Sequence, residues 1–509
     1  MSQLDLLWIG LANSFAPLNL SMTLLGLIVG VVAGALPGIT MLNAIVLVLP
    51  FTYSMDIVPS LLLMTGVYCG GVFGGSITGI LFNIPGDPMN VPATWEGYKL
   101  NKQGHVSKAL GTAILCSALG GFFSGLIMTF ISPPFARVAL SFSATEYFGV
   151  ILLGLVSVVV IGTKSLGSAL ICLFIGMFLG TIGIDDIYGA ARFTYDSRLL
   201  ETGINFTVVL IGLFAIGEVM DQLCRKYPEE GAKVKGRPKT ELPTLADLFS
   251  WKGSLLRGLG IGTVIGGIPG AGATVASFVS YGAEKQFAKE PEKFGNGSWE
   301  GLSSTSVAIN ASTGGAMIPL LALGIPGSGA TAVMMGAFLL HGIQPGPLLF
   351  TKTPESVYTV FVGMLVCNFL MIFAGLSCAK FFSELMRAPE SVMGALIVSM
   401  SLIGAYALRN DMADVMYMAL FGIAGFFMRR YDLPMPPLVL GVILGPLAER
   451  YFITAMIGSG NDWTIFFTRP ITLGLIIASA LILVLPIWQK YRRDRGAAVA
   501  LSDEQAEGC

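Results

Sequence analysis

Residues 31–38 read Val-Val-Ala-Gly-Ala-Leu-Pro-Gly, and residues 263–270 read Thr-Val-Ile-Gly-Gly-Ile-Pro-Gly. Each stretch is an apolar run that ends in a proline followed by a glycine. Proline removes a backbone donor and clashes with the preceding turn, whereas glycine adopts conformations that other residues avoid. We therefore expect an apolar helix to break at each of these two points.

A second Pro-Gly signature follows the first in each half of the chain. Residues 74–86 run from Gly-Gly to Asn-Ile-Pro-Gly, and residues 314–327 run from Gly-Gly to Gly-Ile-Pro-Gly. The same two motifs in the same order predict an internal duplication, in which each half carries two broken helices.

The composition predicts an all-α polytopic membrane protein. Only 12% of the 509 residues are charged and 54% are hydrophobic, with a mean hydropathy of +0.75. Several uncharged runs, such as 57–86 and 301–340, are long enough to cross the roughly 30 Å hydrocarbon layer as helices. A β-barrel would show alternation over short segments instead. We expect about 10–14 transmembrane helices, with re-entrant hairpins fitting as well as full spans near 20–95 and 254–350.

Lys and Arg residues gather in four segments, which lie at residues 99–108, 225–257, 429–430 and 490–495. The positive-inside rule places all four in the cytoplasm, and the number of apolar runs between them is consistent with this. The chain then divides into a first transmembrane repeat (1–223), a cytoplasmic linker (224–253), a second transmembrane repeat (254–489) and a cytoplasmic tail (490–509).

The loops that follow the second Pro-Gly pair differ in charge between the halves. The loop is basic in the first half and nearly uncharged in the second, where His341 and Lys352 are its charged or titratable members. By the charge rule, these equivalent loops face opposite sides, with 341–354 outside. Such an arrangement is typical of the inverted repeats of secondary transporters, and by analogy alternating access would follow an elevator-like movement.

Breaks at membrane depth expose backbone groups that persist only where they are buried in protein or line a cavity. The amides that begin the half-helix after each Pro-Gly suit a carboxylate, and the carbonyls that end the preceding one suit Na⁺. The residues expected to line this substrate or ion site are Pro37, Gly38, Thr40, Asn43, Asn83, Pro85, Gly86, Asp87, Pro269, Gly270, Gly272, Thr274, Asn310, Gly314, Gly315, Gly324, Pro326, Gly327 and Ser328.

Asp87 is the one carboxylate beside a Pro-Gly pair in the sequence. If buried, it would serve as a cation ligand or proton carrier. If it caps a short helix at the interface, it is an ordinary capping residue. The sequence leaves both interpretations open, and it likewise leaves open whether any single Pro-Gly pair kinks a helix only for packing.

Other chemistry is not apparent in the sequence. No Gly-Lys-Ser/Thr phosphate loop occurs, His105 and His341 both fall in predicted loops, and the seven cysteines lack the spacing of a zinc site. We therefore expect no enzymatic activity, no bound metal other than Na⁺ at the tips, and no cofactor besides a coupling Na⁺ or H⁺. The alternative is a channel or an intramembrane enzyme that uses the broken-helix cavity.

With these motifs in hand, the sequence resembles the large membrane subunit of the tripartite tricarboxylate transporters, the TctA family. The resemblance covers nearly the whole chain and is most specific at 266–274 (Gly-Gly-Ile-Pro-Gly-Ala-Gly-Ala-Thr), 294–301 (Phe-Gly-x-Gly-x-x-Glu-Gly), 323–328 (Leu-Gly-Ile-Pro-Gly-Ser) and 341–350 (His-Gly-Ile-Gln-Pro-Gly-Pro-Leu-Leu-Phe). In the first half, residues 68–78 also fit.

The resemblance implies a binding-protein-dependent importer of a di- or tricarboxylate such as citrate, driven by a cation gradient. It implies two partners, a small membrane subunit and a periplasmic solute-binding protein, and a location in a bacterial inner membrane. The chain departs from the family pattern near the expected site. It keeps Asn310 without the usual neighbouring Glu and second Asn, it has Asp87 in place of a small polar residue, and it has Glu96 in place of Asp.

Overall fold

A computed structural model describes residues 2–36, 40–83, 85–160, 165–185, 187–224, 240–385 and 390–484. The expected tail, 490–509, and most of the expected linker, 225–239, lie outside these residues. The described chain is almost entirely helical, and its strands are one antiparallel pair, β1 (Gly183–Ile184) with β2 (Ala191–Arg192). The all-α fold expected from composition is confirmed.

The elements before the linker are α1 (Gln3–Ser14), α2 (Pro17–Ala35), α3 (Met41–Thr52), α4 (Ile57–Phe82), η1 (Pro88–Asn90), α5 (Val91–Lys102), α6 (Val106–Ala139), α7 (Ala144–Val160), α8 (Leu166–Gly180), α9 (Arg198–Glu201), α10 (Phe206–Leu210), the π-helical η2 (Ile211–Ile216) and α11 (Gly217–Cys224). Those after it are α12 (Leu245–Ser250), α13 (Lys252–Gly266), α14 (Gly272–Phe287), η3 (Pro291–Lys293), α15 (Trp299–Leu323), α16 (Gly329–Leu340), α17 (Leu349–Lys352), α18 (Pro354–Leu385), α19 (Glu390–Arg409), α20 (Met412–Arg430), α21 (Met435–Gly458), α22 (Ile465–Thr468) and a last helix, Pro470–Val484.

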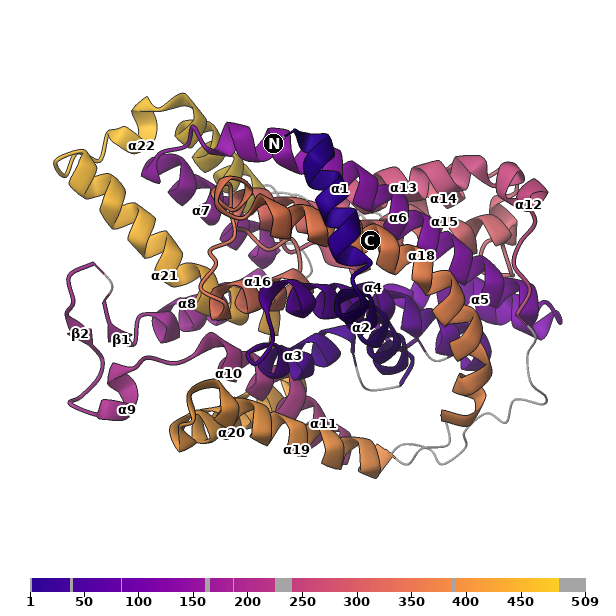
Figure 1. Cartoon of the computed structure of the whole chain (residues 1–509), viewed down its shortest axis with the longest axis horizontal. Helices are drawn as coiled ribbons and strands as arrows, with labels where there is room; N and C mark the ends of the chain where they lie inside the picture. Colours follow the sequence, from indigo (N-terminus) through magenta and orange to yellow (C-terminus); the bar gives the residue numbers. More distant parts are fainter. Residues whose placement is uncertain are drawn as a thin grey trace, which may run out of the picture.

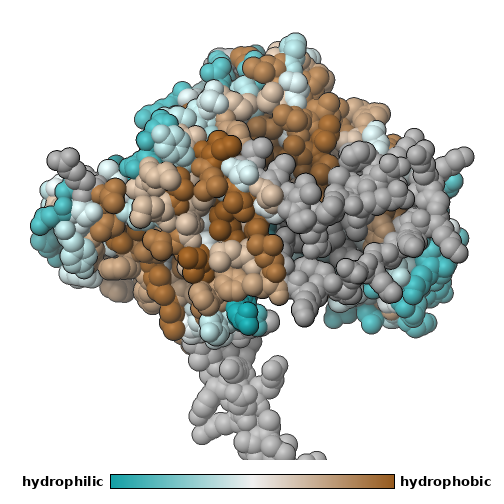
Figure 2. Space-filling model, turned by 90° about the horizontal axis from the view of Figure 1, so that it is seen from below, coloured by the Kyte–Doolittle hydropathy of each residue, from teal (hydrophilic) through white to brown (hydrophobic). Residues whose placement is uncertain are grey.

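Seven of the described helices, α2, α4, α6, α15, α18, α20 and α21, are long and apolar enough to cross a membrane. The half-helices α3 and α16 are apolar but have 12 residues each, which at 1.5 Å per residue gives about 18 Å. They are too short to cross the hydrocarbon layer alone. Large apolar side chains are exposed on several helices, such as Phe174 of α8 and Leu420 of α20. Figure 2 shows broad hydrophobic surfaces with hydrophilic atoms at the margins.

The expected helix breaks at the second, third and fourth Pro-Gly pairs are confirmed. At the first pair, α2 ends at Ala35 and α3 begins at Met41, and residues 37–39 between them lie outside the described residues. We call the segments between the half-helices tip 1 (36–40), tip 2 (83–87), tip 3 (267–271) and tip 4 (324–328). The long helix before tip 2 ends at Asn83 and the one before tip 4 ends at Gly324, both in the left-handed conformation, with φ of 62° and 73°. Glycine and asparagine are the residues that accept this conformation at a helix end.

A repeated glycine contact shows how the two halves resemble each other. Three glycines spaced by four residues on α2 lie against backbone carbonyls of α4: Gly26 against Leu63, Gly30 against Val67 and Gly34 against Gly71. Three glycines with the same spacing on α13 lie against carbonyls of α15: Gly258 against Ser304, Gly262 against Ala308 and Gly266 against Ser312. A Cβ at any of these six positions would lie within 3.0 Å of a carbonyl oxygen. Each half therefore contains one copy of the same tightly packed helix pair.

The half-helices after the tips pack on the opposite half of the chain. The α3 half-helix lies beside α16 (Figure 1), and α14 packs on η1, which directly follows tip 2. Farther out, α6 packs on α15 and α18 packs on α4. The two halves are therefore interleaved.

Candidate functional site

Tip 2 packs against the C-terminal end of α2. Pro85 is half-buried, and a Cβ on Gly86 would collide with the carbonyl oxygen of Gly34 and with Gly75 of α4. The Gly86 amide donates to the Gly75 carbonyl at 3.3 Å. Only glycine allows the chain to turn this close to both helices.

Asp87 joins the two tips of the first half. Its Oδ2 accepts a hydrogen bond from the Met41 backbone amide at 2.9 Å, at the start of α3. Asp87 stands at the N-cap position of η1 but makes no capping bond to that helix. The carboxylate is buried, with 8% of the residue exposed. Asp87 therefore caps a helix other than its own, and its negative charge lies at the positive end of the α3 dipole.

The start of α3 holds the other tip 1 candidates. Pro37 and Gly38 lie outside the described residues. Thr40 is the N-cap residue, and its hydroxyl accepts from the Asn43 amide at 3.3 Å. The Asn43 side chain is buried, and neither of its amide atoms has a hydrogen-bond partner within the described part of the chain. A buried unpaired amide costs about 1–3 kcal/mol, so a bound group that pairs with it would recover this energy.

Tips 3 and 4 are hydrogen-bonded to each other. The Gly270 amide donates to the Gly327 carbonyl at 3.1 Å, and both Gly270 and Gly272 have positive φ. Pro326 and Gly327 are buried, whereas Pro269 is half-buried. The second half thus repeats the close approach of paired tips seen in the first.

Tip 4 also reaches the first half. Ser328 caps α16 in a capping box with Thr331, and its hydroxyl lies 3.3 Å from the hydroxyl of Tyr68 on α4. The next residue, Gly329, faces Leu42 of α3. The structure therefore brings tip 4 beside the half-helix of tip 1. Tyr68 was not among the predicted site residues, although it begins the motif at residues 68–78.

Four of the predicted residues lie in helix packing or at a helix end. Gly314 lies against Ser124 of α6, and Gly315 lies against the carbonyl of Thr263, so a side chain at either position would collide with a neighbouring helix. The side chain of Asn83 is exposed. Thr274 is half-buried in the first turn of α14, where its carbonyl accepts from a serine hydroxyl one turn later.

Asn310 lies where α15 crosses α4. Its amide nitrogen donates to the Cys69 carbonyl at 3.3 Å, and its Oδ1 is buried without a partner among the described residues. Since one half of this side chain is already used to hold the two long helices together, a ligand could use only the oxygen. Polar groups that bridge helices in this way are common in membrane bundles.

Glu96 is a buried carboxylate that the sequence did not place in any site. Its Oε1 accepts from the Tyr281 hydroxyl and the Gly295 amide, both at 2.6 Å. Its Oε2 accepts from the amides of Gly297 and Ser298, at 2.9 and 2.7 Å. Glu96 therefore ties α5 of the first half to the loop that enters α15. The motif at residues 294–301, with its two glycines, was the available signal.

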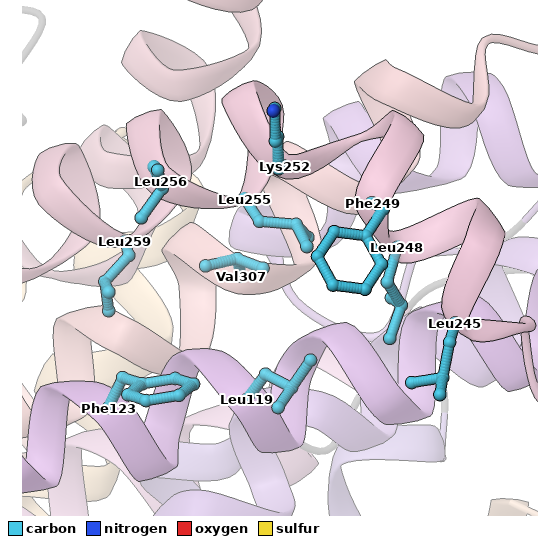
Figure 3. A pocket seen from close by; sticks show the side chains of 10 residues that line it. All are labelled: Leu119, Phe123, Leu245, Leu248, Phe249, Lys252, Leu255, Leu256, Leu259 and Val307. Carbon is cyan, nitrogen blue, oxygen red and sulfur yellow. The ribbon is translucent and has the colours of Figure 1, made fainter.

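A cavity of about 420 Å³ lies away from the tips, between α6, α12 and α13. Figure 3 shows leucine and phenylalanine side chains pointing into it, while the amino group of Lys252 points away. Such a lining does not suit a carboxylate. Among the described residues, no group of three or more His, Cys, Asp or Glu is placed to hold a metal ion.

A bundle of broken helices in which the two halves interleave is an arrangement found in secondary transporters. The comparison with protein families agrees: residues 20–440 match the model of the tripartite tricarboxylate transporter TctA family. The chain belongs to this family and is a polytopic membrane subunit of a transporter of this kind.

Two relatives come from Agrobacterium vitis. An uncharacterized 52.8 kDa protein in the TAR-I ttuC′ 3′ region is 34% identical over 501 residues, which cover 97% of this chain and 98% of the relative. An uncharacterized protein in the TAR-II ttuC′ 3′ region is 36% identical over 228 residues, covering 44% of this chain and 94% of the relative. No solved structure matches the chain.

Proposed function

We propose that this chain is the large membrane subunit of a secondary transporter that imports a small di- or tricarboxylate, such as citrate, with a cation gradient. Its substrate and coupling ion would bind between the Pro-Gly tips. The observation that carries the proposal is the meeting of tip 4 with the first half, through the hydroxyls of Ser328 and Tyr68. These groups, with the unpaired amide of Asn43, are donors that a carboxylate can use.

The cation would be Na⁺ or H⁺, and the Asp87 carboxylate would be the group that binds it. Its carboxylate is buried at the start of α3, where a bound cation or proton would lower the cost of the buried charge. Alternating access by an elevator-like movement of one part of the bundle is an analogy with other inverted-repeat carriers. The half-helices α3 and α16, which pack across the halves, would move together in it.

Membership of a tripartite family supports two partners, a small membrane subunit and a periplasmic solute-binding protein that delivers the carboxylate. It also supports a place in the cytoplasmic membrane of a bacterium. Both partners would have to be present for transport at physiological substrate concentrations.

The test is uptake into vesicles that contain this chain with its two partners. A panel of labelled di- and tricarboxylates is supplied outside, and a Na⁺ or H⁺ gradient is imposed without ATP. We expect one carboxylate to accumulate above its outside concentration, and accumulation to stop when the gradient is dissipated. Uptake that depends on ATP alone would overturn the proposal, and flux that never exceeds equilibration would favour a channel.

A further inference from the structure

The loop of the motif at residues 341–350 lines a second cavity. This cavity has a volume of about 430 Å³ and lies between the loop 344–348, the N-terminal end of α7 and the C-terminal part of α21. These elements gather with α22 at the upper left of Figure 1. The proposed function leaves both the motif and the cavity without a role.

The cavity is next to tip 4. Leu323, the last residue of α15, is part of its lining. A Cβ on Gly324 would lie 2.6 Å from the carbonyl oxygen of Pro345, so the loop rests directly on the left-handed turn that opens the tip. A molecule bound in this cavity would therefore lie beside tip 4, one short loop away from the proposed transport site.

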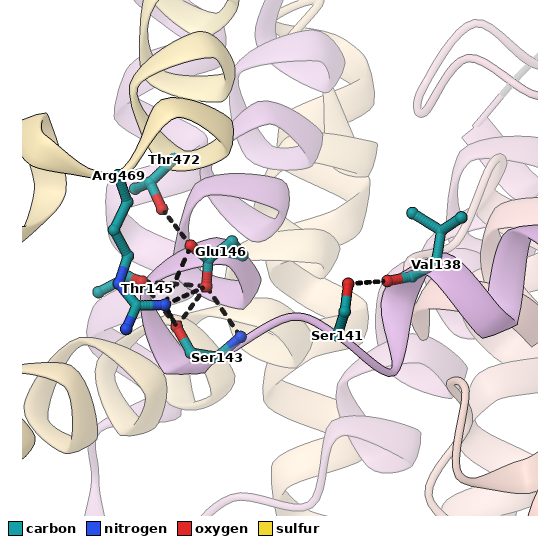
Figure 4. A network of polar contacts seen from close by, with 7 residues as sticks. All are labelled: Val138, Ser141, Ser143, Thr145, Glu146, Arg469 and Thr472. Carbon is teal, nitrogen blue, oxygen red and sulfur yellow. Dashed lines mark hydrogen bonds and ion pairs between the residues drawn. The ribbon is translucent and has the colours of Figure 1, made fainter.

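One arginine, Arg450, is part of the lining of the cavity. Arg450 of α21 is exposed, and within the described part of the chain it forms no ion pair. The neighbouring arginines differ: Arg192 pairs with Glu449, and Arg469 pairs with Glu146 at 3.3 Å. Figure 4 shows Arg469 directed at Glu146 and Ser143. Ser143 is part of the lining of the cavity. The charge of Arg450 is thus available for an anion.

The rest of the lining suits a small organic acid. Tyr147 and Tyr451 stack with ring centroids 5.0 Å apart, and Ser143, Gln344 and Thr454 add polar groups. Binding sites for small molecules combine such apolar walls with a few polar groups that fix orientation. A guanidinium matches a carboxylate with two parallel hydrogen bonds.

We propose that this cavity, which we call the Arg450 cavity, binds a small organic carboxylate on the outer side of the protein, with its carboxylate on Arg450. This inference rests on the proposed function, because it takes the bound carboxylate to be the transport substrate, which then moves from the cavity to tip 4. The outer location follows from the charge rule, which places the loop 341–354 outside.

The first experiment tests whether the Arg450 cavity attracts anions. Thr454 is exposed in the cavity, and Thr454→Cys introduces a thiol there. Its reaction with an anionic and with a cationic methanethiosulfonate reagent is compared in the full-length protein. The same protein with Thr454 intact gives the background from its native cysteines, most of which are buried. Each rate is divided by the rate of the same reagent with a small free thiol, because a thiolate reacts faster with a cationic reagent even without a protein. We expect this normalised rate to be about fivefold higher for the anionic reagent than for the cationic one, because of the nearby positive charge.

Two variants distinguish the effect of the Arg450 charge from the effect of other positive charges on the outer side of the protein. Arg450→Gln should abolish the preference for the anionic reagent, whereas Lys352→Gln, at an exposed lysine outside the cavity, should leave it intact. Citrate at 10 mM should slow the anionic reagent in the Thr454→Cys protein and have no effect in the Arg450→Gln background. Equal normalised rates for both reagents, or no protection by citrate or any other di- or tricarboxylate tested, would overturn the site.

Uptake measurements test the link to transport. Arg450→Gln should raise the concentration of carboxylate needed for half-maximal uptake about tenfold and leave the maximal rate unchanged. Protection by citrate with an unchanged half-maximal concentration would overturn the role in substrate entry. If the unmodified protein takes up no carboxylate, the proposed function fails, while the labelling experiment still decides whether the cavity binds anions.

Discussion

Glu96→Gln should release the loop 294–298 from α5. The carboxylate accepts four hydrogen bonds of 2.6–2.9 Å, two on each oxygen. Glutamine keeps one acceptor oxygen and turns its amide group toward the two donors that remain. Each hydrogen bond to a charged group contributes about 1.5–3 kcal/mol, so the loss of two costs about 3 kcal/mol at the low end of that range.

The amides of Gly295, Gly297 and Ser298 report this loss directly. A penalty of about 3 kcal/mol should speed their hydrogen exchange roughly 100-fold, as measured by mass spectrometry on peptides that cover the loop. Glu292→Gln is the control, because Glu292 is exposed in η3 of the same segment. Unchanged exchange in Glu96→Gln, or an equal change in the control, would refute the view that Glu96 holds the loop.

Two further predictions concern backbone geometry. Gly324→Ala should lower the thermal unfolding midpoint, because alanine costs about 1–2 kcal/mol at a left-handed φ and its Cβ would lie 2.6 Å from the Pro345 carbonyl. Asn83→Gly, at the matching helix end, should change that midpoint little, and an equal effect of both would contradict the prediction. Gly262→Leu should abolish the recovery of monodisperse protein by separating α13 from α15, whereas Gly260→Leu, where nothing lies within 4 Å, should be recovered normally. Normal recovery of Gly262→Leu would count against the glycine contact.

The four helix breaks could be predicted from sequence because each follows from local chemistry. Proline cannot donate to the preceding turn, and the residue at the end of the helix before tip 2 or tip 4 is an asparagine or a glycine. The duplication was equally visible, since its motifs are short and contiguous. The number of helices that cross the membrane was left open near 20–95 and 254–350, because an apolar run does not reveal where a helix of 12 residues stops.

The arrangement of the site could not be predicted from sequence in the same way. Asp87 was expected either to bind a cation or proton or to cap the helix that follows it. It does not cap that helix but accepts from the Met41 amide of α3, 46 positions earlier in the chain, and its role as a ligand stays a prediction. Tyr68 and Glu96 were missed for the same reason, since their partners, Ser328 and the loop 294–298, come from the other half. Gly314 and Gly315 were expected at the site and instead pack against α6 and α13. Contacts between distant segments decide these roles, and a single sequence does not show which distant residues are in contact.

The central claim is that the Pro-Gly tips hold the substrate and its coupling cation. It is tested most directly by gradient-driven uptake of the transported carboxylate into vesicles that contain Asp87→Asn. Asp56→Asn is the control, because Asp56 is exposed at the start of α4 and its side chain makes no capping bond. We predict that the unmodified protein and the control accumulate the carboxylate under the gradient, and that Asp87→Asn does not. Equal accumulation by all three proteins would contradict the claim.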